Sequence, residues 1–438
     1  MHTITTRSMS KYDDSVSGRF VPCSSASGSL SGQHTYHKTV NPDLSEYPTP
    51  FYLYDMGLLN ETLDRLSSAA SRHHYTVHYA MKANHESEIL DAVRQYGFGA
   101  DCVSGPEVSA AMEHGFSADS IVFAGVGKTD AEIRLGLGKG ILCFNCESLE
   151  ELGVIAEIAS AMDVEARVAL RVNPEVDADT HHKITTGRIE NKFGIPLPQL
   201  GRALDLCRDN PFLRFMGLHF HIGSQITSNE PFVQLCRQVS RIWKEFRIDS
   251  YGAVMLNMGG GLGINYPDPE GQAIPDFEGF FGEFARHLDI PGHIRVHFEL
   301  GRSVVGQCCS LITSVLYVKQ GVNKQFLITD AGMTELMRPA LYGAIHKIDN
   351  LSSAGAAETY DVAGPACESS DVFARDLSLP AARRGDLLAV RSCGAYVQSM
   401  TLNYNLRPAA PAVFDYASRQ KPALTSVIRR EPLAVAAV

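Results

Sequence analysis

The fold is decided by the stretch TVHYAMKANHESEILDAVRQYGFGADCV, residues 76–103. It opens with a short β-branched and aromatic run, continues through a segment with helical periodicity at 85–97, and closes in a second strand-like run. The same alternation continues along the chain, which predicts a series of β/α units with parallel strands. The predicted strands are 76–81, 97–103, 120–125, 141–145, 166–173, 215–222, 253–259 and 294–300.

Eight such units are typical of a parallel (β/α)8 barrel, and a doubly wound open sheet is the alternative. After residue 303, strand-like runs follow one another with little helix between them, which predicts a mostly antiparallel β domain. We therefore expect a flexible leader at 1–46, the barrel at 47–302 and the β domain at 303–438. The first strand-like run, TPFYLYD (49–55), fits either domain.

The composition excludes several classes of protein. Of the 438 residues, 45% are hydrophobic and 20% charged, which is typical of a globular chain rather than a disordered one. A formal net charge of −10 argues against binding to nucleic acid or to an anionic membrane surface. Because the sequence shows neither a long apolar run nor the apolar core of a signal peptide, we expect a cytoplasmic protein.

Neither the cysteines nor the histidines predict a metal site. Ten cysteines in 438 residues are too dilute for a disulfide framework. Cys143 and Cys146 form a CxxC pair without a second pair at zinc spacing, so buried reduced thiols are the better interpretation. His219 and His221 alternate along one strand, but no further ligand cluster accompanies them. Such a histidine more often packs against a flat ligand or in the core.

Reactive residues follow the predicted strands at their C-terminal ends, where barrels carry their active sites. A lysine flanked by an apolar strand can have a depressed pKa and form a Schiff base, although a solvated surface lysine is the alternative. Three consecutive glycines let backbone N–H groups approach a phosphate, although a tight structural turn also uses them. The residues at these ends are Lys82, Asp101, Ser104, Arg171, Asn173, His221, Gly223, Ser224, GGGLG (259–263), Glu299 and Arg302. We expect one site at one mouth of the barrel.

Seven ordered motifs between about residue 47 and residue 405 resemble those of the pyridoxal-phosphate decarboxylases with the alanine-racemase-like fold, and most closely the diaminopimelate decarboxylase family. The motifs are YAMKAN (79–84), HFHIGSQ (219–225), GGGLG (259–263), ELGR (299–302), DAGMTELMRPALYGA (330–344), GPACESSD (364–371) and GAY (394–396). The resemblance implies decarboxylation of meso-2,6-diaminopimelate to L-lysine and CO₂, the final step of lysine biosynthesis, with pyridoxal 5'-phosphate as cofactor. The alternative is a decarboxylase of ornithine, lysine or a siderophore precursor.

The resemblance also implies a role for each motif residue. Lys82 would hold the cofactor through a Schiff base, and His221 would stack on its ring. Glu299 would pair with the ring nitrogen and so strengthen the ring as an electron sink. Cys367, from the second subunit of a homodimer with shared sites, would protonate the carbanion. The full set of implied cofactor-binding residues is Lys82, His221, Ser224, Gly259, Gly260, Gly261, Glu299, Gly301, Arg302 and Tyr396.

The implied substrate-binding residues carry both signs of charge. Arg302 and Arg338 offer guanidinium groups suited to a carboxylate, and Glu368 could receive an ammonium group. Tyr342 and Tyr396 would add hydroxyls. Such a set fits an amino acid whose distal end is itself an amino acid, whereas a simple diamine would not use two arginines.

Three further points bear on the resemblance. A non-catalytic homologue would lack Lys82 or Cys367, and a metal-dependent barrel hydrolase would rely on the two histidines of HFHIGSQ. The sequence has Leu300 where the family often has proline. It has Val397 where glycine is common, which puts the backbone beside Tyr396 in question.

Overall fold

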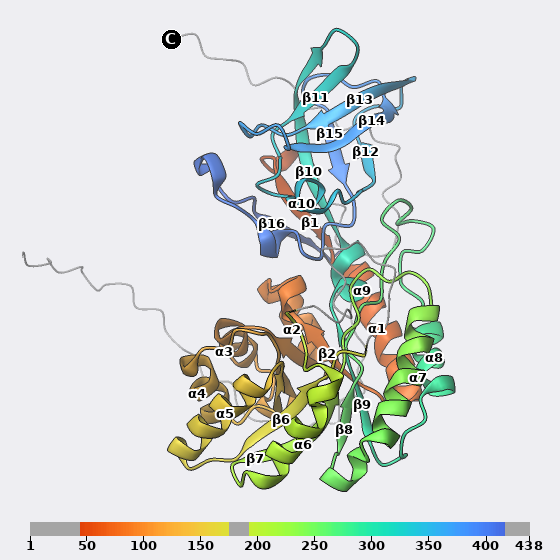
Figure 1. Ribbon diagram of the computed structural model, residues 1–438. Helices are drawn as coiled ribbons and strands as arrows, with labels where there is room; N and C mark the ends of the chain where they lie inside the picture. Colours follow the sequence, from red (N-terminus) through yellow and green to blue (C-terminus); the bar gives the residue numbers. More distant parts are fainter. Residues whose placement is uncertain (1–43, 175–191, 417–438) are drawn as a thin grey trace, which may run out of the picture. The chain divides into compact units, whose positions relative to one another are not determined.

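The computed structural model describes residues 44–174 and 192–416, and eight parallel strands in it close into a barrel (Figure 1). The strands are β2 (Thr76–Ala80), β3 (Gly99–Cys102), β4 (Ile121–Phe123), β5 (Cys143–Cys146), β6 (Ala166–Arg171), β7 (Leu213–His219), β8 (Met255–Asn257) and β9 (Arg295–Leu300). Strand β9 closes the ring on β2, with His78 opposite Glu299. The predicted barrel is confirmed, and the open sheet is wrong because the first strand is paired on both sides.

Helices surround the barrel strands, and the first of them precedes the first barrel strand (Figure 1). The helices are α1 (Met56–Arg72), α2 (Ser87–Gln95), α3 (Gly105–Glu113), α4 (Asp130–Lys139), α5 (Leu149–Met162), α6 (Leu200–Asp209), α7 (Glu230–Glu245) and α8 (Phe277–His287). Side-chain caps define several starts: Ser104 accepts from the Glu107 N–H at α3, and Thr129 forms a capping box with Glu132 at α4.

Strand β9 illustrates how alternation separates the core from the site. Phe298 points outward, and its ring lies 4.8–5.6 Å from the rings of Tyr75, Phe280, Phe281 and Phe284. Its neighbours His297 and Glu299 point into the barrel, as a period of two requires. An apolar outer layer therefore holds the strands while polar side chains gather inside.

The β domain contains strands from both ends of the described chain. Its strands are β1 (Phe51–Asp55), β10 (Cys309–Gln320), β11 (Gln325–Thr329), β12 (Ile348–Asn350), β13 (Ala357–Ala363), β14 (Val372–Pro380), β15 (Leu387–Val390) and β16 (Ala412–Asp415). Most pairs are antiparallel, as predicted, but β11 runs parallel to β13 and β1 parallel to β16. Strand β1 also pairs with β10, so the first strand-like run belongs to this sheet. Two short helices, α9 (Arg302–Val305) and α10 (Arg338–Tyr342), follow the barrel and β11.

Several sequence expectations concern features outside the barrel mouth. The predicted leader, apart from its last residues 44–46, lies outside the described residues. Cys143 and Cys146 are buried free thiols in β5, and burial raises the pKa of Cys143 to about 12. Within residues 44–174 and 192–416, no cluster of His, Cys, Asp and Glu is arranged to hold a metal ion. In the same ranges no helix is both long and apolar enough to cross a membrane.

Candidate active site

The lysine at the end of the first barrel strand lies beside a buried carboxylate. Lys82 belongs to the turn η2 (Met81–Ala83), and its Nζ lies 3.2 Å from Oδ2 of Asp101. Burial alone lowers the pKa of Lys82, but the nearby negative charges, of which that of Asp101 is the largest, together outweigh it and hold that pKa above its ordinary value. The depressed amine pKa expected from the sequence is therefore wrong for the free chain, since the sequence did not reveal this partner.

Asp101 itself is fully buried and has a changed pKa. Burial and the nearby charge of Glu299 raise the pKa of the Asp101 carboxyl to about 7. Its Oδ1 has no hydrogen-bond partner in the described part of the chain. The carboxyl group can therefore hold or release a proton next to the Lys82 amine.

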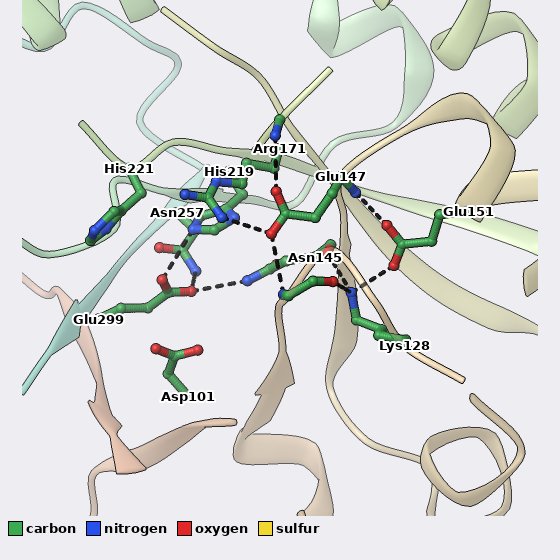
Figure 2. A network of polar contacts seen from close by, with 12 residues as sticks. Asp101, Lys128, Asn145, Glu147, Glu151, Arg171, His219, His221, Asn257 and Glu299 are labelled. Atoms are coloured by element: carbon green, nitrogen blue, oxygen red, sulfur yellow. Dashed lines mark hydrogen bonds and ion pairs between the residues drawn. The ribbon is translucent and has the colours of Figure 1, made fainter. Parts of the chain in front are cut away.

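Glu299 is a buried carboxylate that accepts three hydrogen bonds from three other strands of the barrel (Figure 2). Asn145 and Asn257 donate to its Oε1 at 2.9 and 2.7 Å, and His219 Nε2 lies 3.0 Å from its Oε2. Burial by itself raises the pKa of Glu299, but His219, together with smaller contributions from Lys82 and His221, more than offsets this and lowers the pKa below its ordinary value. The group is a charged carboxylate whose remaining acceptor capacity lies on Oε2.

Buried charged residues around the backbone of Asn145 fix its position. The Lys128 ammonium group is buried and donates to two backbone carbonyl oxygens, that of Asn145 among them, and to the Glu151 carboxylate at 2.6 Å. Nearby, Glu147 accepts from Arg171 Nη1 at 2.7 Å (Figure 2). Burial alone would raise the pKa of Glu147, but Arg171 lowers it below its ordinary value. These pairs satisfy charges that would otherwise be costly to bury.

The glycine run after β8 is required by close backbone packing. A Cβ at Gly260 would lie 1.9 Å from the carbonyl oxygen of Glu299, and Gly259 and Gly261 have φ angles of +68° and +109°. The Gly259 N–H donates to Oδ1 of Asn257 at 2.9 Å. Of the three glycines, only Gly261 has an N–H without an acceptor in the described ranges.

His221 carries its proton on Nε2, because its Nδ1 accepts from the Gly260 N–H at 3.3 Å. Burial, followed by the charges of Arg171 and Lys82, holds the pKa of His221 well below its ordinary value. The ring is neutral and lies just after the end of β7. A neutral flat ring in this place suits stacking on a planar ligand.

Two arginines of the candidate site converge on a tyrosine that the sequence did not single out. Arg302 Nη1 donates to the Tyr266 hydroxyl at 2.5 Å, and Arg338 Nη1 donates to the same oxygen at 2.7 Å. Arg302 also donates to Oγ of Ser224 at 2.9 Å, and Arg338 lies 3.0 Å from Nε2 of His346. All three partners lie on loops at the end of the barrel strands or in the β domain.

Contacts at the YAMKAN motif join the barrel to residues of the β domain. Asn84 donates to the Tyr54 hydroxyl at 2.8 Å and to the carbonyl oxygen of Gly394 at 2.9 Å. The Tyr396 N–H donates to the carbonyl oxygen of Ala83 at 2.8 Å. The GAY motif (394–396) is therefore held directly against the residues flanking Lys82.

The two departures from the resembled family, Leu300 and Val397, are buried residues. Tyr396 takes the positive φ of +57°, and its ring lies 4.7 Å from the Arg302 guanidinium carbon. Val397 has a φ of −121° and a ψ of −78°, a combination outside the helical and extended regions. Leu300 is a buried strand residue paired with Tyr79.

Cys367 and Glu368 form no hydrogen bond or ion pair with the barrel residues of this site in the described part of the chain. Both are exposed on the loop between β13 and β14, where the Cys367 N–H donates to Oδ1 of Asn405 at 3.1 Å. Tyr342 ends α10, the helix that begins with Arg338, and is half-buried. The structure thus groups Lys82, Glu299, Arg302 and the other barrel residues but leaves the GPACESSD loop apart.

Other residues predicted at the strand ends have structural roles. Ser104 caps α3, and the Asn173 N–H donates to the carbonyl oxygen of Ile195 at 3.2 Å. A Cβ at Gly301 would lie 2.9 Å from that of Ala83, so this glycine allows close packing beside Lys82.

Sequence reasoning missed the residues that hold the charged groups. They are Asn145, Asn257, Lys128, Glu147, Tyr266 and His346. For Asn145 and Asn257 a signal existed in the sequence, because each is a polar residue near the C-terminal end of an otherwise apolar strand. Tyr266 and His346 lie outside the strands, and only the folded chain brings them to the arginines.

Comparison with known proteins agrees with this geometry. Residues 57–306 match the family described as pyridoxal-dependent decarboxylase, pyridoxal binding domain. A diaminopimelate decarboxylase of Bacteroides thetaiotaomicron is 51% identical over 360 residues, which cover 82% of this chain and 93% of the relative.

Solved structures extend the similarity to the whole fold. A Helicobacter pylori diaminopimelate decarboxylase complexed with L-lysine is 37% identical, with a TM-score of 0.79 over 83% of this chain and 91% of that one. A Vibrio vulnificus lysine/ornithine decarboxylase complexed with putrescine has a TM-score of 0.73 at 22% identity, over 85% and 96% of the two chains, and shares the fold alone. The barrel mouth and these matches together show that the chain belongs to the diaminopimelate decarboxylase family of pyridoxal-dependent decarboxylases.

Proposed function

We propose that this protein decarboxylates meso-2,6-diaminopimelate to L-lysine and CO₂ with pyridoxal 5'-phosphate as cofactor. The observation that carries the proposal is the pairing, at one barrel mouth, of the Lys82 amine and the buried Glu299 carboxylate with two arginines that lack an acidic partner within the described ranges. The lysine and the buried carboxylate suit the cofactor, and the two arginines suit a substrate with a carboxylate at its distal end.

The residues present fit the cofactor. Oε2 of Glu299 keeps acceptor capacity for a protonated ring nitrogen, and the Gly261 N–H keeps its donor for a phosphate. Arg302 has a buried Nε without a partner in the described part of the chain. We infer that Lys82 bonds to the carbonyl carbon of the cofactor and that His221 stacks on the cofactor ring. The phosphate would be surrounded by Ser224, Gly259, Gly260, Gly261, Gly301, Arg302 and Tyr396.

Each protein group has a defined task in this mechanism. When bound, the cofactor supplies an electron sink for the charge that remains on Cα after CO₂ leaves. Glu299, held charged by His219, Asn145 and Asn257, keeps the ring nitrogen protonated. Asp101, whose pKa is raised to about 7, exchanges a proton with the Lys82 amine.

The distal end of the substrate is recognised by charge. Arg302 and Arg338, with the hydroxyls of Tyr342 and Tyr396, bind the carboxylate that is not lost, and Glu368 binds the neighbouring ammonium group. Ornithine and lysine as substrates carry only an amine there. We therefore favour diaminopimelate over a decarboxylase of ornithine, lysine or a siderophore precursor.

The exposed position of Cys367 supports a homodimer with shared sites. In such a dimer, Cys367 and Glu368 of one chain complete the site of the other, and the Cys367 thiol delivers the proton to Cα. We also propose that the chain is organised as a leader (1–46), a cofactor-binding barrel (47–302) whose first strand-like run, β1, joins the other domain, and a β domain (303–438) that supplies substrate and interface residues. The cytoplasmic location stays a prediction from the sequence.

The test uses purified protein reconstituted with pyridoxal phosphate. Meso-diaminopimelate, L-ornithine and L-lysine are supplied in parallel, and CO₂ and the chirality of the amine products are followed. We expect L-lysine from diaminopimelate alone, and no activity from Lys82→Ala. Bound cofactor absorbance without CO₂ from diaminopimelate would contradict the substrate, and CO₂ from L-ornithine would favour the alternative.

A further inference from the structure

A cluster of four buried side chains holds the two substrate arginines together. The cluster consists of Arg302, Arg338, Tyr266 and His346, each between 4% and 7% exposed. Both guanidinium groups donate to the one Tyr266 hydroxyl oxygen, at 2.5 and 2.7 Å, and so occupy its two acceptor lone pairs. Two like charges brought onto one oxygen repel each other, and this arrangement needs a reason.

Every partner of the two guanidinium groups in the described chain is neutral. Arg302 donates to the hydroxyls of Tyr266 and Ser224, and Arg338 donates to Tyr266 and His346. Neither forms an ion pair with a carboxylate among residues 44–174 and 192–416. Their two positive charges are thus oriented by hydrogen bonds without being neutralised.

His346 is fixed as a neutral acceptor. Its Nδ1 lies 2.8 Å from the backbone carbonyl oxygen of Arg391, which can only accept, so Nδ1 carries the proton and Nε2 is free to accept from Arg338. Burial, then the charge of Arg338, lowers the pKa of His346 to about 3. Over the working pH range the ring therefore adds no charge to the cluster.

We propose that Tyr266 is a positioning and specificity-determining residue, which aligns Arg302 and Arg338 as an unneutralised pair for the distal carboxylate of the substrate, with His346 fixing Arg338. This inference rests on the proposed function. Tyr266 also contacts both guanidinium groups with its ring face, at 5.8 Å from Arg302 and 4.6 Å from Arg338, which limits the orientations that either can adopt.

The same pair could serve a second anion, the cofactor phosphate, because Arg302 also contacts Ser224. The substrate carboxylate and the cofactor phosphate differ in which arginine they need. A phosphate held by Ser224 and Arg302 does not require Arg338, which is anchored by His346. The shared hydroxyl of Tyr266 joins the two arginines and is therefore expected to matter most for the ligand that uses both.

The test compares two ligands that differ only in this carboxylate. L-Lysine carries a carboxylate on its amino-acid end, whereas 1,5-diaminopentane has the same chain and both amines without it. Binding of each to the reconstituted holoenzyme is titrated by the absorbance of the bound cofactor, for the wild type, Tyr266→Phe and His346→Leu. Tyr251→Phe is the matched control, since Tyr251 is a hydroxyl at the other end of the barrel, 3.5 Å from Asp205.

We expect the wild type to favour L-lysine over 1,5-diaminopentane. Tyr266→Phe should raise the Kd for L-lysine about tenfold, because one hydrogen bond to each charged group is lost, and leave the Kd for the diamine and for the cofactor unchanged. The KM for meso-diaminopimelate should rise by a similar factor with kcat nearly constant. His346→Leu should give a smaller rise, and Tyr251→Phe none.

An unchanged L-lysine affinity in Tyr266→Phe would overturn the inference. Weaker cofactor binding with unchanged L-lysine binding would also overturn it, and would assign the pair to the phosphate. If the wild type binds both ligands equally, the proposed substrate fails instead, and the two failures are distinguished. Thermal unfolding of each holoenzyme identifies a variant that does not fold, in which case His346→Leu carries the test.

Discussion

The imidazole of His219 and the carboxylate of Glu299 lie 3.0 Å apart, at the ends of β7 and β9 on the inner face of the barrel. His219 is 1% exposed, and its Nδ1 has no hydrogen-bond partner among the described residues. Because a carboxylate only accepts, His219 donates to Glu299 through Nε2 and stabilises the charge of the carboxylate.

Replacing His219 by phenylalanine should raise the pKa of Glu299, because the largest contribution that lowers this pKa is then removed. In the wild type the lowered pKa keeps Glu299 charged as the pH falls. In the variant Glu299 takes up a proton at higher pH, so the acidic limb of the kcat profile should move to higher pH. We expect roughly a tenfold loss of kcat at neutral pH with little change in KM. The measurement is the pH profile of kcat together with the absorbance of the bound cofactor.

His219→Gln should restore much of this loss, since its amide can donate to the same oxygen. His297→Phe is the matched control, because His297 is a buried histidine that pairs with His78 at 2.8 Å and does not touch Glu299. A profile for His219→Phe that coincides with that of His297→Phe would rule out a specific effect on the carboxylate.

Gly260→Ala should destabilise the protein and weaken cofactor binding. The added Cβ would lie 1.9 Å from the Glu299 carbonyl oxygen, so the strand carrying the carboxylate must move. We expect a loss of about 3 kcal/mol in unfolding free energy. Gly153→Ala in α5 is the control, where no atom lies within 4 Å and the helix should gain about 0.5–1 kcal/mol. Equal unfolding midpoints for the two variants would contradict the crowding argument.

Acid should destabilise the fold through its buried neutral histidines. Burial lowers the pKa of His78, His221, His297 and His346, the last to about 3. A depressed histidine pKa means that only the unfolded chain binds the proton, so stability present above pH ~6.5 is lost as the pH falls towards the folded values. Urea unfolding at pH 7 and pH 5 should show this decrease.

His346→Gln tests one member of the set. The slope of unfolding free energy against pH should become shallower by up to ~1.4 kcal/mol per pH unit, whatever the variant's stability at pH 7. Exchange of an exposed histidine, such as His293→Gln, should leave the slope as it is. A slope unaffected by His346→Gln would mean that this ring does not stay neutral in the folded chain.

Mixing two inactive variants tests the shared site. Lys82→Ala and Cys367→Ala should each abolish decarboxylation, because one lacks the cofactor link and the other the proton donor. If chains exchange at random, half of the dimers are hybrids and each hybrid has one intact site. Activity should therefore recover to about a quarter of the wild-type value.

With a size tag on one variant, size-exclusion chromatography before and after mixing supplies the control for exchange, because hybrid dimers then elute between the two homodimers. Full activity of Cys367→Ala by itself would exclude the thiol as the donor. Exchange without recovered activity would show that each site is completed within one chain.

The strands of the barrel could be predicted from the sequence because each has a local signal. The eight apolar runs from 76–81 to 294–300 overlap the strands β2 to β9, although β5 extends to Cys146 and β7 begins at Leu213, and polar residues after several of them marked the mouth. Lys82, Glu299 and Arg302 were found in this way and lie together. The glycine run was found for a related reason, since only glycine fits the approach of Gly260 to β9.

The remaining parts depend on contacts between segments far apart in the sequence. Asp101 raises the pKa of Lys82 across a 19-residue separation, and Tyr266 meets Arg338 across 72 residues. No local pattern records such meetings. The depressed lysine pKa was wrong for this reason, and Tyr266 was missed for the same one.

The pairing of β1 with β10 and β16 makes the barrel an insertion within the β domain. Phe51 is opposite Ile312 in one pair, and Tyr52 is opposite Ala412 in the other. A ribosome must therefore release the entire barrel before β1 has either neighbour, and contacts of this sequence separation slow folding. A chain cut after residue 302 would retain every barrel strand but expose β1 as an unpaired edge, open to association with other chains.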